Sequence, residues 1–373
     1  MNSVFGIADW KINSEEERNL AAEADICEEG KFKYVEYYRK ADPAYFEKGL
    51  MMVNQVIDVH KPYIDKEQRN GYVIDMIYSL HRFGCMFNEY FMFDYENLNT
   101  NGRSQFITDK IRWYYYLKLN RFDKIKEYDD KERTYQKFSQ SFGRELIIIR
   151  GMEDHARLIQ FANKHKSFCI KPLFGGGGKG FEVIRDASPF AAEKIIKERD
   201  FPFVAEELII QHPIMGAFHS KSVNTLRMPT IYDGTKVSLF HPILRTGTGG
   251  SPIDNTTRGG IFASVDPKTG IVDSVGLDRR GRRFVRHPET GIVFPGFQIP
   301  EWEKAVNLVS IVAQKDEGVH YVGWDIAFSK KGWVLVEGNA NAEFVGWQSV
   351  SRRGVRQEID AFVSYLCEEN RVI

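Results

Sequence analysis

Four consecutive glycines occupy residues 175–178, inside the stretch KPLFGGGGKGFEV that begins at Lys171. Glycine within a regular element costs about 0.5–1 kcal/mol relative to alanine, so this run indicates a backbone that other residues cannot adopt. One use of such a backbone is to let main-chain N–H groups surround a phosphate. The alternative is a glycine-rich turn that binds no ligand, and the surrounding sequence has to separate the two.

The residues beside the glycines argue against the better-known phosphate loops. A Walker A loop needs Ser or Thr after its lysine and then a helix, whereas Lys179 is followed by Gly180 and an extended segment. Gly175, Gly177 and Gly180 satisfy GxGxxG, but a dinucleotide-binding turn leads into a helix. A protein kinase also needs HRD and DFG motifs, which the sequence lacks. The order that remains is strand, lysine, glycine loop, strand.

Two carboxylates and an amide near the C-terminal end have the spacing of a metal site. Asp325 and Glu337 lie 12 residues apart, and residues 330–332 between them form a hairpin turn signal. Side chains alternate along a strand, so Glu337 and Asn339 share a face and the hairpin brings Asp325 beside them. Such oxygens are the ligands that Mg²⁺ takes together with nucleotide phosphates. An isolated ExN is more often a surface strand, but after a phosphate-type loop we interpret it as a magnesium site.

These residues lie in the C-terminal two thirds of the chain, where the pattern indicates strands and turns. Apolar runs at 145–149 and 168–170 predict short buried strands on either side of a helix near 153–165. Asp233-Gly234 between two alternating runs predicts a hairpin. An amphipathic helix is expected at 300–314. The motifs would therefore be held by strands, with helices packed against them.

The region from residue 1 to about 125 differs, because it has few glycines and its apolar positions follow helical spacing. Ser14 before three glutamates predicts a helix start, and another helix is expected over 66–83. The stretches 90–98 and 113–117 are rich in aromatic residues. We interpret them as packing surface, with a substrate-binding aromatic wall as the alternative.

The composition is that of an ordinary globular protein. The chain has 373 residues, enough for two or three domains, and is 43% apolar and 27% charged. Its 51 basic and 51 acidic residues give no sign of a nucleic-acid or anionic-membrane partner. No apolar run could span a bilayer, no signal peptide is recognisable, and the four cysteines form no CxxC pair. We therefore expect a cytoplasmic protein.

The order of these motifs resembles that of ATP-grasp enzymes, and most of all the sugar-transfer-associated ATP-grasp group found with cell-surface polysaccharide genes. The resemblance covers the chain from about residue 126 to its end. Its motifs are weak singly and specific in this order. They are DDKERTYQKF (129–138), IKPLFGGGGKGFEV (170–183), VAEELIIQHP (204–213), VNTLRMPT (223–230) and WDIAFSKKGWVLVEGN (324–339).

This resemblance implies an α+β protein with an ATP-grasp fold, in which two α+β subdomains clamp ATP. The lid subdomain would cover about 126–205 and the metal-binding subdomain about 206–373. A mainly helical region, 1–125, would precede them. That region departs from the α/β domain that usually comes before an ATP-grasp core, so the origin of the acceptor pocket is left open.

The resemblance also implies roles for individual residues. Two lysines would neutralise α- and β-phosphate oxygens, a glycine loop would close over the β- and γ-phosphates, and a hinge would recognise adenine through its backbone. The metal residues would hold one or two Mg²⁺ ions, and Gln211 would approach the ribose. The implied ATP-binding residues are Lys131, Lys171, Gly175, Gly176, Gly177, Gly178, Lys179, Gly180, Glu206, Glu207, Leu208, Ile209 and Gln211; the metal residues are Asp325, Glu337 and Asn339.

Two arginines are further candidates. Arg227 in NTLRMP and Arg245 in ILRTGTGG would stabilise the transferred phosphoryl group, because electrostatic stabilisation is the largest catalytic term in such chemistry. The alternative for each is a salt bridge or a solvated strand position. Candidates for the acceptor side are Asn224, Asn255, Arg258, Gly259, Gly260 and Asn341.

The activity implied by the resemblance is that of an ATP-dependent carboxylate–amine ligase. A carboxylate would attack the γ-phosphate of ATP, giving an acyl phosphate and ADP, and an amine would then displace phosphate to form an amide. The substrates would be a small-molecule acid and amine, one of them a sugar acid or amino acid of capsule or exopolysaccharide assembly. The alternatives are an ATP-grasp phosphotransferase acting on a sugar, and a nucleotide-binding module without catalysis.

Overall fold

The computed structural model describes residues 14–175, 178–250 and 259–368. It divides into two compact units, which are taken one at a time. The helical unit comprises Met1–Lys118, Arg279–Arg283 and Glu343–Val372, and the sheet unit comprises Leu119–Asp278 and Phe284–Ala342. The C-terminal residues thus group with the N-terminal ones, whereas the sequence suggests a contiguous division near residue 125.

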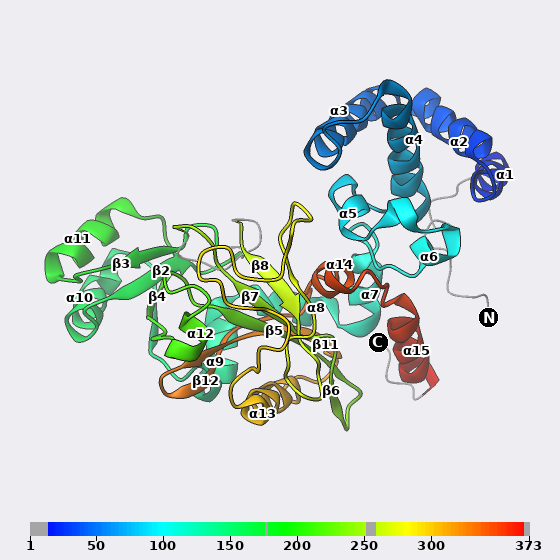
Figure 1. The fold of residues 1–373 in the computed structure, drawn as a ribbon. Helices are drawn as coiled ribbons and strands as arrows, with labels where there is room; N and C mark the ends of the chain where they lie inside the picture. The colour runs from blue at the N-terminus through cyan, green and yellow to red at the C-terminus, as the bar shows by residue number, and fades with distance from the viewer. Residues whose placement is uncertain (1–13, 176–177, 251–258, 369–373) are drawn as a thin grey trace. The chain divides into compact units, whose positions relative to one another are not determined.

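The helical unit is built from α-helices, as its sequence predicts (Figure 1). Ser14 caps the first helix by accepting a hydrogen bond from Glu17 N at 3.0 Å, and the helix predicted over 66–83 has those bounds. A capping box of Asp65 and Gln68 begins it. The helices are α1 (Glu15–Ala24), α2 (Glu28–Ala41), α3 (Pro43–His60), α4 (Lys66–Phe83), α5 (Phe87–Met92), η2 (Tyr95–Asn97), α6 (Thr100–Ser104), α7 (Arg112–Leu119), α14 (Val345–Ser351) and α15 (Arg356–Glu368).

Most aromatic side chains of the two aromatic-rich stretches pack inside the helical unit. This burial supports the packing interpretation for those residues over the substrate-wall alternative, because a buried ring has no surface left for a ligand. Trp113 and Tyr114 remain exposed, and Phe91 is half-buried. The buried rings are those of Tyr90, Phe93, Tyr95, Tyr115 and Tyr116.

The smaller sheet of the sheet unit has four antiparallel strands in the order β1-β4-β2-β3. Two helices cover one face, where Ile147 and Ile170 of the sheet pack with Leu158 and Ile195 (Figure 1). The strands and the helix predicted between 145 and 170 are thereby confirmed. The elements are β1 (Leu146–Ile149), η3 (Met152–Asp154), α10 (His155–Lys164), β2 (Phe168–Pro172), β3 (Glu182–Ile184), α11 (Pro189–Glu198) and β4 (Phe203–Glu207).

The larger sheet has the order β10-β9-β8-β7-β5-β11-β12, with β6 beside β5. Both predicted hairpins are present, at Asp233-Gly234 and at residues 330–332. Every residue of β11 is buried, as expected for a strand in the middle of a covered sheet. The strands are β5 (Thr225–Tyr232), β6 (Val237–Leu239), β7 (Ile243–Thr246), β8 (Ile261–Ser264), β9 (Gly276–Leu277), β10 (Arg283–Phe284), β11 (Tyr321–Ser329) and β12 (Gly332–Asn339).

Four further helices belong to the sheet unit. One of them confirms the amphipathic helix predicted at 300–314, and it packs against β5, β11 and β12. Another carries Lys131 as its first residue and packs against β12. The helices are α8 (Phe122–Tyr128), α9 (Lys131–Phe142), α12 (Pro213–Gly216) and α13 (Trp302–Ala313).

A β-bulge interrupts the β11–β12 hairpin beside its acidic residues. Asp325 lies opposite Glu337, but Ile326 lies opposite Leu335, so Val336 is an extra residue on β12. Neighbouring residues of a strand point to opposite faces, so Asp325 and Ile326 face opposite ways and their partners follow them. The bulge therefore sends Leu335 into the core, where it is fully buried, and leaves Glu337 facing Asp325.

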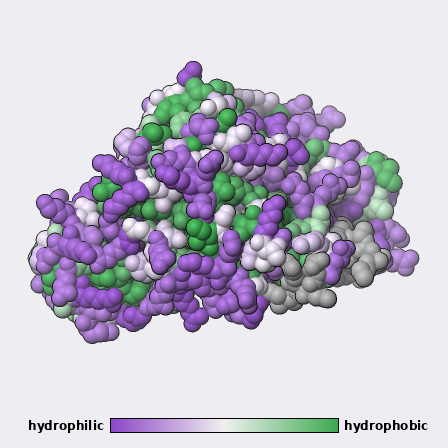
Figure 2. Space-filling view, turned by 90° about the horizontal axis from the view of Figure 1, so that it is seen from below, coloured by the Kyte–Doolittle hydropathy of each residue, from purple (hydrophilic) through white to green (hydrophobic). Residues whose placement is uncertain are grey.

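No helix in the described ranges is long and apolar enough to cross a membrane. The face drawn in Figure 2 is largely hydrophilic, and its apolar side chains lie in separate patches. Scattered apolar side chains of this kind are normal on protein surfaces and need no partner to explain them.

Candidate functional site

Asp325 is the centre of a charged cluster on the larger sheet. Arg227 lies opposite it in the β5–β11 register and donates from Nη2 to Asp325 Oδ2 at 2.9 Å, with a further bond from Nε to Oδ1. Arg245, on β7, donates from Nη1 to the same Oδ2 at 3.0 Å. Burial would raise the pKa of Asp325, but the two guanidinium groups outweigh it and lower that pKa to about 2. The cluster therefore holds an ionised carboxylate inside the protein.

Glu337 and Asn339 complete this cluster from β12. Asn339 Nδ2 donates to Glu337 Oε1 at 3.3 Å, and Glu337 lies opposite Asp325 in the β11–β12 register. Burial, and then the neighbouring Asp325 charge, raise the pKa of Glu337. The hairpin thus brings together the three residues that the sequence predicts as metal ligands.

These three residues fit a magnesium ion by their chemistry. Asp325 and Glu337 lie opposite each other in the hairpin, and a divalent cation bound by both carboxylates would relieve the repulsion between them. Among the residues that the structure describes, no group of three or more His, Cys, Asp or Glu side chains could hold a metal. The third protein ligand would therefore be the Asn339 amide oxygen, and Mg²⁺ ordinarily keeps several waters in such a site.

The two predicted lysines lie at the smaller sheet, on either side of the glycine loop. Lys131 Nζ donates to Gly175 O at 2.6 Å and to Leu173 O at 3.3 Å. Lys171, on β2, forms an ion pair with Glu206. Burial, and then the charge of Lys171, lower the pKa of Lys131. Two neighbouring ammonium groups that repel each other in this way form a place suited to an anionic group.

The glycine loop uses conformations that favour glycine. Gly175, Gly178 and Gly180 have φ of +88°, +71° and +70°, which side chains other than hydrogen disfavour. A Cβ on Gly180 would also lie 2.8 Å from Pro172 Cγ. Lys179 between them is exposed. Gly176 and Gly177, which the sequence also assigns to the loop, lie outside the described residues.

The predicted adenine hinge lies where the two sheets are joined. Its Leu208 and Ile209 connect the end of β4 to Gln211, which forms an isolated bridge with Ser329 of the larger sheet. Glu207 accepts a hydrogen bond from Glu145 N at 3.1 Å. This segment therefore links the smaller sheet, which carries Lys171, to the larger sheet, which carries Asp325 and Glu337.

The amide of Gln211 is already engaged in hydrogen bonds, which does not favour the ribose contact that the resemblance implies. Its Oε1 accepts from Asn224 N at 2.7 Å, and its Nε2 donates to Ser222 O at 3.1 Å. Asn224 is fully buried, and its Oδ1 has no hydrogen-bond partner among the described residues. The two side chains thus organise the segment before β5, and Gln211 would have to give up these bonds to reach a ribose.

The remaining acceptor candidates are scattered. Gly259 O accepts a hydrogen bond from Thr248 Oγ1 at 2.7 Å, and its φ is +92°. Asn341 is half-buried in the turn after β12. Asn255 and Arg258 lie outside the described residues. The structure therefore brings the nucleotide and metal candidates into clusters, but it does not gather the acceptor candidates into one.

One charged residue of this region was not predicted. Arg144 lies between α9 and β1, is buried, and forms an ion pair with Glu206. Nothing in the local stretch SFGRELI distinguishes this arginine from a solvated one. Its partner Glu206 is 62 residues away, so only the folded structure identifies it.

Comparisons with known proteins identify a family for this chain. A family model described as sugar-transfer associated ATP-grasp matches residues 110–363. An uncharacterised protein of Methanocaldococcus jannaschii is 29% identical over 145 residues, which are 39% of this chain and 37% of that protein. The chain thus spans well under half of this relative.

Among solved structures, similarity is remote. N5-carboxyaminoimidazole synthase from Aspergillus clavatus, in complex with ADP and 5-aminoimidazole ribonucleotide, is 10% identical with a TM-score of 0.40, over 65% of this chain and 54% of that one. D-alanyl-alanine synthetase A from Vibrio cholerae is 11% identical with a TM-score of 0.40, over 66% of this chain and 65% of that one. The chain therefore spans between half and two thirds of these two proteins.

Proposed function

The chain belongs to the sugar-transfer associated ATP-grasp family, and on that premise we propose that it is an ATP-dependent ligase that joins a carboxylate to an amine. The observation that carries this proposal is the pairing of two charged clusters in one unit. Lys131 and Lys171 flank a left-handed glycine loop, and Asp325, Glu337 and Asn339 present hard oxygen ligands. A nucleotide bound with a divalent cation fits both clusters, because its phosphates would bind the lysines and the cation would bind the oxygen ligands.

Nucleotide binding would use the smaller sheet and the hinge. The ammonium groups of Lys131 and Lys171 would neutralise phosphate oxygens, and the backbone N–H groups of the glycine loop would close over the β- and γ-phosphates. When ATP arrives, Lys131 would exchange its bond to Gly175 O for a phosphate oxygen. A Mg²⁺ ion held by Asp325, Glu337 and Asn339 would supply charge neutralisation of the phosphates when bound.

The first chemical step would be phosphoryl transfer to the acid. An oxygen of the substrate carboxylate attacks the γ-phosphorus, the bond to the β-phosphate oxygen breaks, and its electron pair leaves with ADP. Arg227 and Arg245, which form ion pairs with Asp325, would stabilise the negative charge on the transferred group. Positioning and charge neutralisation suffice, so no side-chain nucleophile is required.

The second step would form the amide. The lone pair of the amine attacks the acyl carbon of the acyl phosphate, the bond to phosphate breaks, and the amine nitrogen gives up a proton to water or to phosphate. We place the substrates among sugar acids, amino acids and amino compounds of cell-surface polysaccharide assembly, which rests on the family description alone.

Transfer of a heavy oxygen isotope tests this function. The protein is incubated with Mg-ATP, a panel of sugar acids and amino acids labelled in the carboxylate oxygens, and pooled amines, and the released phosphate is analysed by mass spectrometry. Labelled phosphate is expected, since one carboxylate oxygen leaves with phosphate when the acyl phosphate is consumed. A phosphorylated sugar with unlabelled phosphate would instead indicate a phosphotransferase, and ATP binding without turnover would indicate a nucleotide-binding module.

A further inference from the structure

Arg144 has more contacts to the charged clusters than any local feature of its sequence explains. It lies in the connector between α9, which begins with Lys131, and β1. Its side chain is only 5% exposed. The guanidinium group reaches three places at once: a carboxylate on β4, two carbonyls on β12 and the Phe142 carbonyl at the end of α9.

The first contact places Arg144 behind Lys171. Its Nε and Nη2 both bind Glu206 Oε1, while the other carboxylate oxygen is in ion-pair contact with Lys171 Nζ. One buried carboxylate is therefore shared by two cations, which leaves a net positive charge on the group. Without Arg144, Glu206 would neutralise Lys171 fully, and the lysine would have less charge to offer a phosphate.

The second contact places Arg144 behind Glu337. Its Nη1 donates to Leu335 O at 2.5 Å, and its Nη2 donates to Val336 O at 3.4 Å. Val336 is the extra residue of the β-bulge, and the bulge is what turns Glu337 toward Asp325. Because a bulge disrupts the strand ladder, a donor that holds its carbonyls also fixes the direction of the next side chain.

We propose that Arg144 is a positioning residue of the ligase site, holding Lys171 through Glu206 and Glu337 through the bulged carbonyls of β12. The proposal rests on the proposed function, because it takes Lys171 as a nucleotide ligand and Glu337 as a metal ligand. A planar guanidinium with five N–H donors in a fixed fork sets the two contacts at one mutual distance. Lys171 and Glu337 would contact the phosphates and the metal ion of the same nucleotide, so their side chains must be held at the correct spacing. Small errors in that spacing lower the reaction rate steeply.

A simpler role is also consistent with part of the geometry. Nη1 of Arg144 donates to Phe142 O at 2.9 Å, and the guanidinium lies 4.9 Å from the Phe142 ring centroid. These contacts alone would only stabilise the turn after α9. A purely structural arginine would change the unfolding temperature when replaced, but it would leave the affinities of the folded protein for ATP and metal unchanged.

The test compares two variants of Arg144 with a matched control. Arg144→Lys keeps the charge beside Glu206 but loses the fork to the β12 carbonyls, and Arg144→Gln loses both. The control is Lys137→Gln, which removes another ion pair of α9, that between Lys137 and the buried Asp316, without touching the clusters. Each protein is measured for ATP affinity in EDTA by calorimetry, for Mn²⁺ affinity in the presence of ATP by electron paramagnetic resonance, and for unfolding temperature.

The expected pattern separates the two contacts. Arg144→Lys should keep its metal-free ATP affinity within about threefold and lose about tenfold in Mn²⁺ affinity, a typical loss for a residue that orients a metal ligand. Arg144→Gln should lose about tenfold in both. Lys137→Gln should lose stability alone.

Two different failures are distinguishable. Wild-type protein that binds ATP and Mn²⁺, with both Arg144 variants matching it in both affinities at the temperature where they are folded, would overturn this inference alone. Wild-type protein that binds neither ligand would overturn the proposed function and this inference with it.

Discussion

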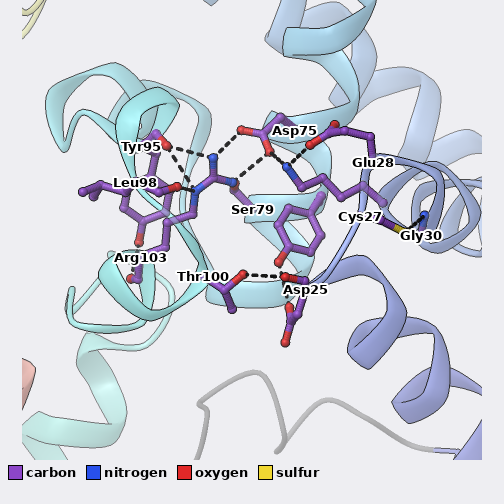
Figure 3. A network of polar contacts seen from close by, with 12 residues as sticks. Asp25, Cys27, Glu28, Gly30, Asp75, Ser79, Tyr95, Leu98, Thr100 and Arg103 are labelled. Atoms are coloured by element: carbon purple, nitrogen blue, oxygen red, sulfur yellow. Dashed lines mark hydrogen bonds and ion pairs between the residues drawn. The ribbon is translucent and has the colours of Figure 1, made fainter.

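The helical unit and the sheet unit each bury arginine and carboxylate groups, but they do so in different ways. In the helical unit, Asp75 accepts from Arg103 Nη1 and Nη2 at 2.8 and 2.7 Å and from Lys31 at 2.8 Å (Figure 3). Arg103 Nη1 also donates to Ser79 Oγ at 3.0 Å. Burial would raise the pKa of Asp75, but the Arg103 guanidinium outweighs it and lowers that pKa. Each charge in this network has an opposite charge beside it.

The sheet unit also forms ion pairs, but it places like charges beside each other as well. The neighbouring Asp325 raises the pKa of Glu337 in addition to burial, and Lys171 lowers the pKa of Lys131 in addition to burial. A fully paired network rigidifies a fold, whereas an unresolved conflict of charge is tolerated where a ligand of opposite charge resolves it. We interpret the first network as structural, and we propose that the second binds a nucleotide and a cation.

The largest expected effect is on turnover, from Glu337→Gln. This variant removes one of the two metal carboxylates, and we expect ADP formation with the labelled acid panel to fall by about 10³-fold or more. The unfolding temperature should stay the same or rise, because the repulsion with Asp325 is relieved. A variant that keeps its turnover, or that loses stability in proportion to its activity, would remove the distinction between the two clusters.

The corresponding change in the helical unit should act in the opposite sense. Asp75→Asn leaves Arg103 and Lys31 without their shared charged partner, so we expect a loss of about 3–5 kcal/mol in unfolding free energy. Metal-dependent ATP affinity of the folded protein should be unchanged. Urea unfolding and calorimetry measure the two quantities on the same sample. A loss of ATP affinity at full folding would show that this network takes part in ligand binding.

Glu89 provides a further test of the comparison, because it is a carboxyl group in the helical unit whose burial disfavours its ionised form. Burial raises its pKa to about 8, although its two carboxylate oxygens accept hydrogen bonds from Met86 N and Asp109 N. The unfolded chain releases this proton near its ordinary pKa, so between that value and pH about 8 the folded state holds a proton that the unfolded state has lost. Stability should therefore fall as pH rises through this window.

The size of this pH effect is on the order of 3–4 kcal/mol between pH about 5 and 8. Urea unfolding of wild type and Glu89→Gln at several pH values measures it. The variant should lose this part of the pH dependence, while its ATP affinity is kept. An identical pH profile for the two proteins would show that Glu89 is ionised in the folded state.

The smallest expected effects concern the glycine loop. Gly180→Ala combines a φ of +70° with a Cβ contact of 2.8 Å to Pro172, whereas Gly175→Ala has a φ of +88° and no atom within 4 Å of its Cβ. We expect both to lose about 1 kcal/mol from the left-handed backbone, and Gly180→Ala to lose more because Pro172 must also move. Thermal unfolding compares them directly. Equal losses would show that the contact with Pro172 is easily relieved.

Local pattern was enough to predict much of the fold. The hairpin that pairs Asp325 with Glu337, the helix over 66–83 and the need for glycine at Gly180 all depend on residues close together in sequence. Strand alternation alone, however, would put Leu335 on the same face as Glu337. The bulge at Val336 reverses this, and its carbonyls accept hydrogen bonds from Arg144, which is 191 and 192 residues away in the chain.

The same limit explains what the sequence did not indicate about side-chain roles. Gln211 follows the predicted hinge, but its amide is engaged by Asn224 and Ser222, which only the folded loop brings near. Glu206 was predicted from its motif. Its two ion pairs, with Lys171 and with Arg144, could not be predicted, because the three residues lie on three separate segments of the chain. Long-range partners of this kind carry no periodicity, so no pattern in a single sequence identifies them.

The most direct test of the central claim is a calorimetric titration of ATP into the wild-type protein, once with Mg²⁺ and once with EDTA. We predict saturable binding that Mg²⁺ strengthens about tenfold or more, and a Glu337→Gln variant that keeps the metal-free affinity but loses the gain from Mg²⁺. Lys131 and Lys171 would account for the part that remains. No ATP binding, or an affinity that is the same with Mg²⁺ and with EDTA, would contradict the account.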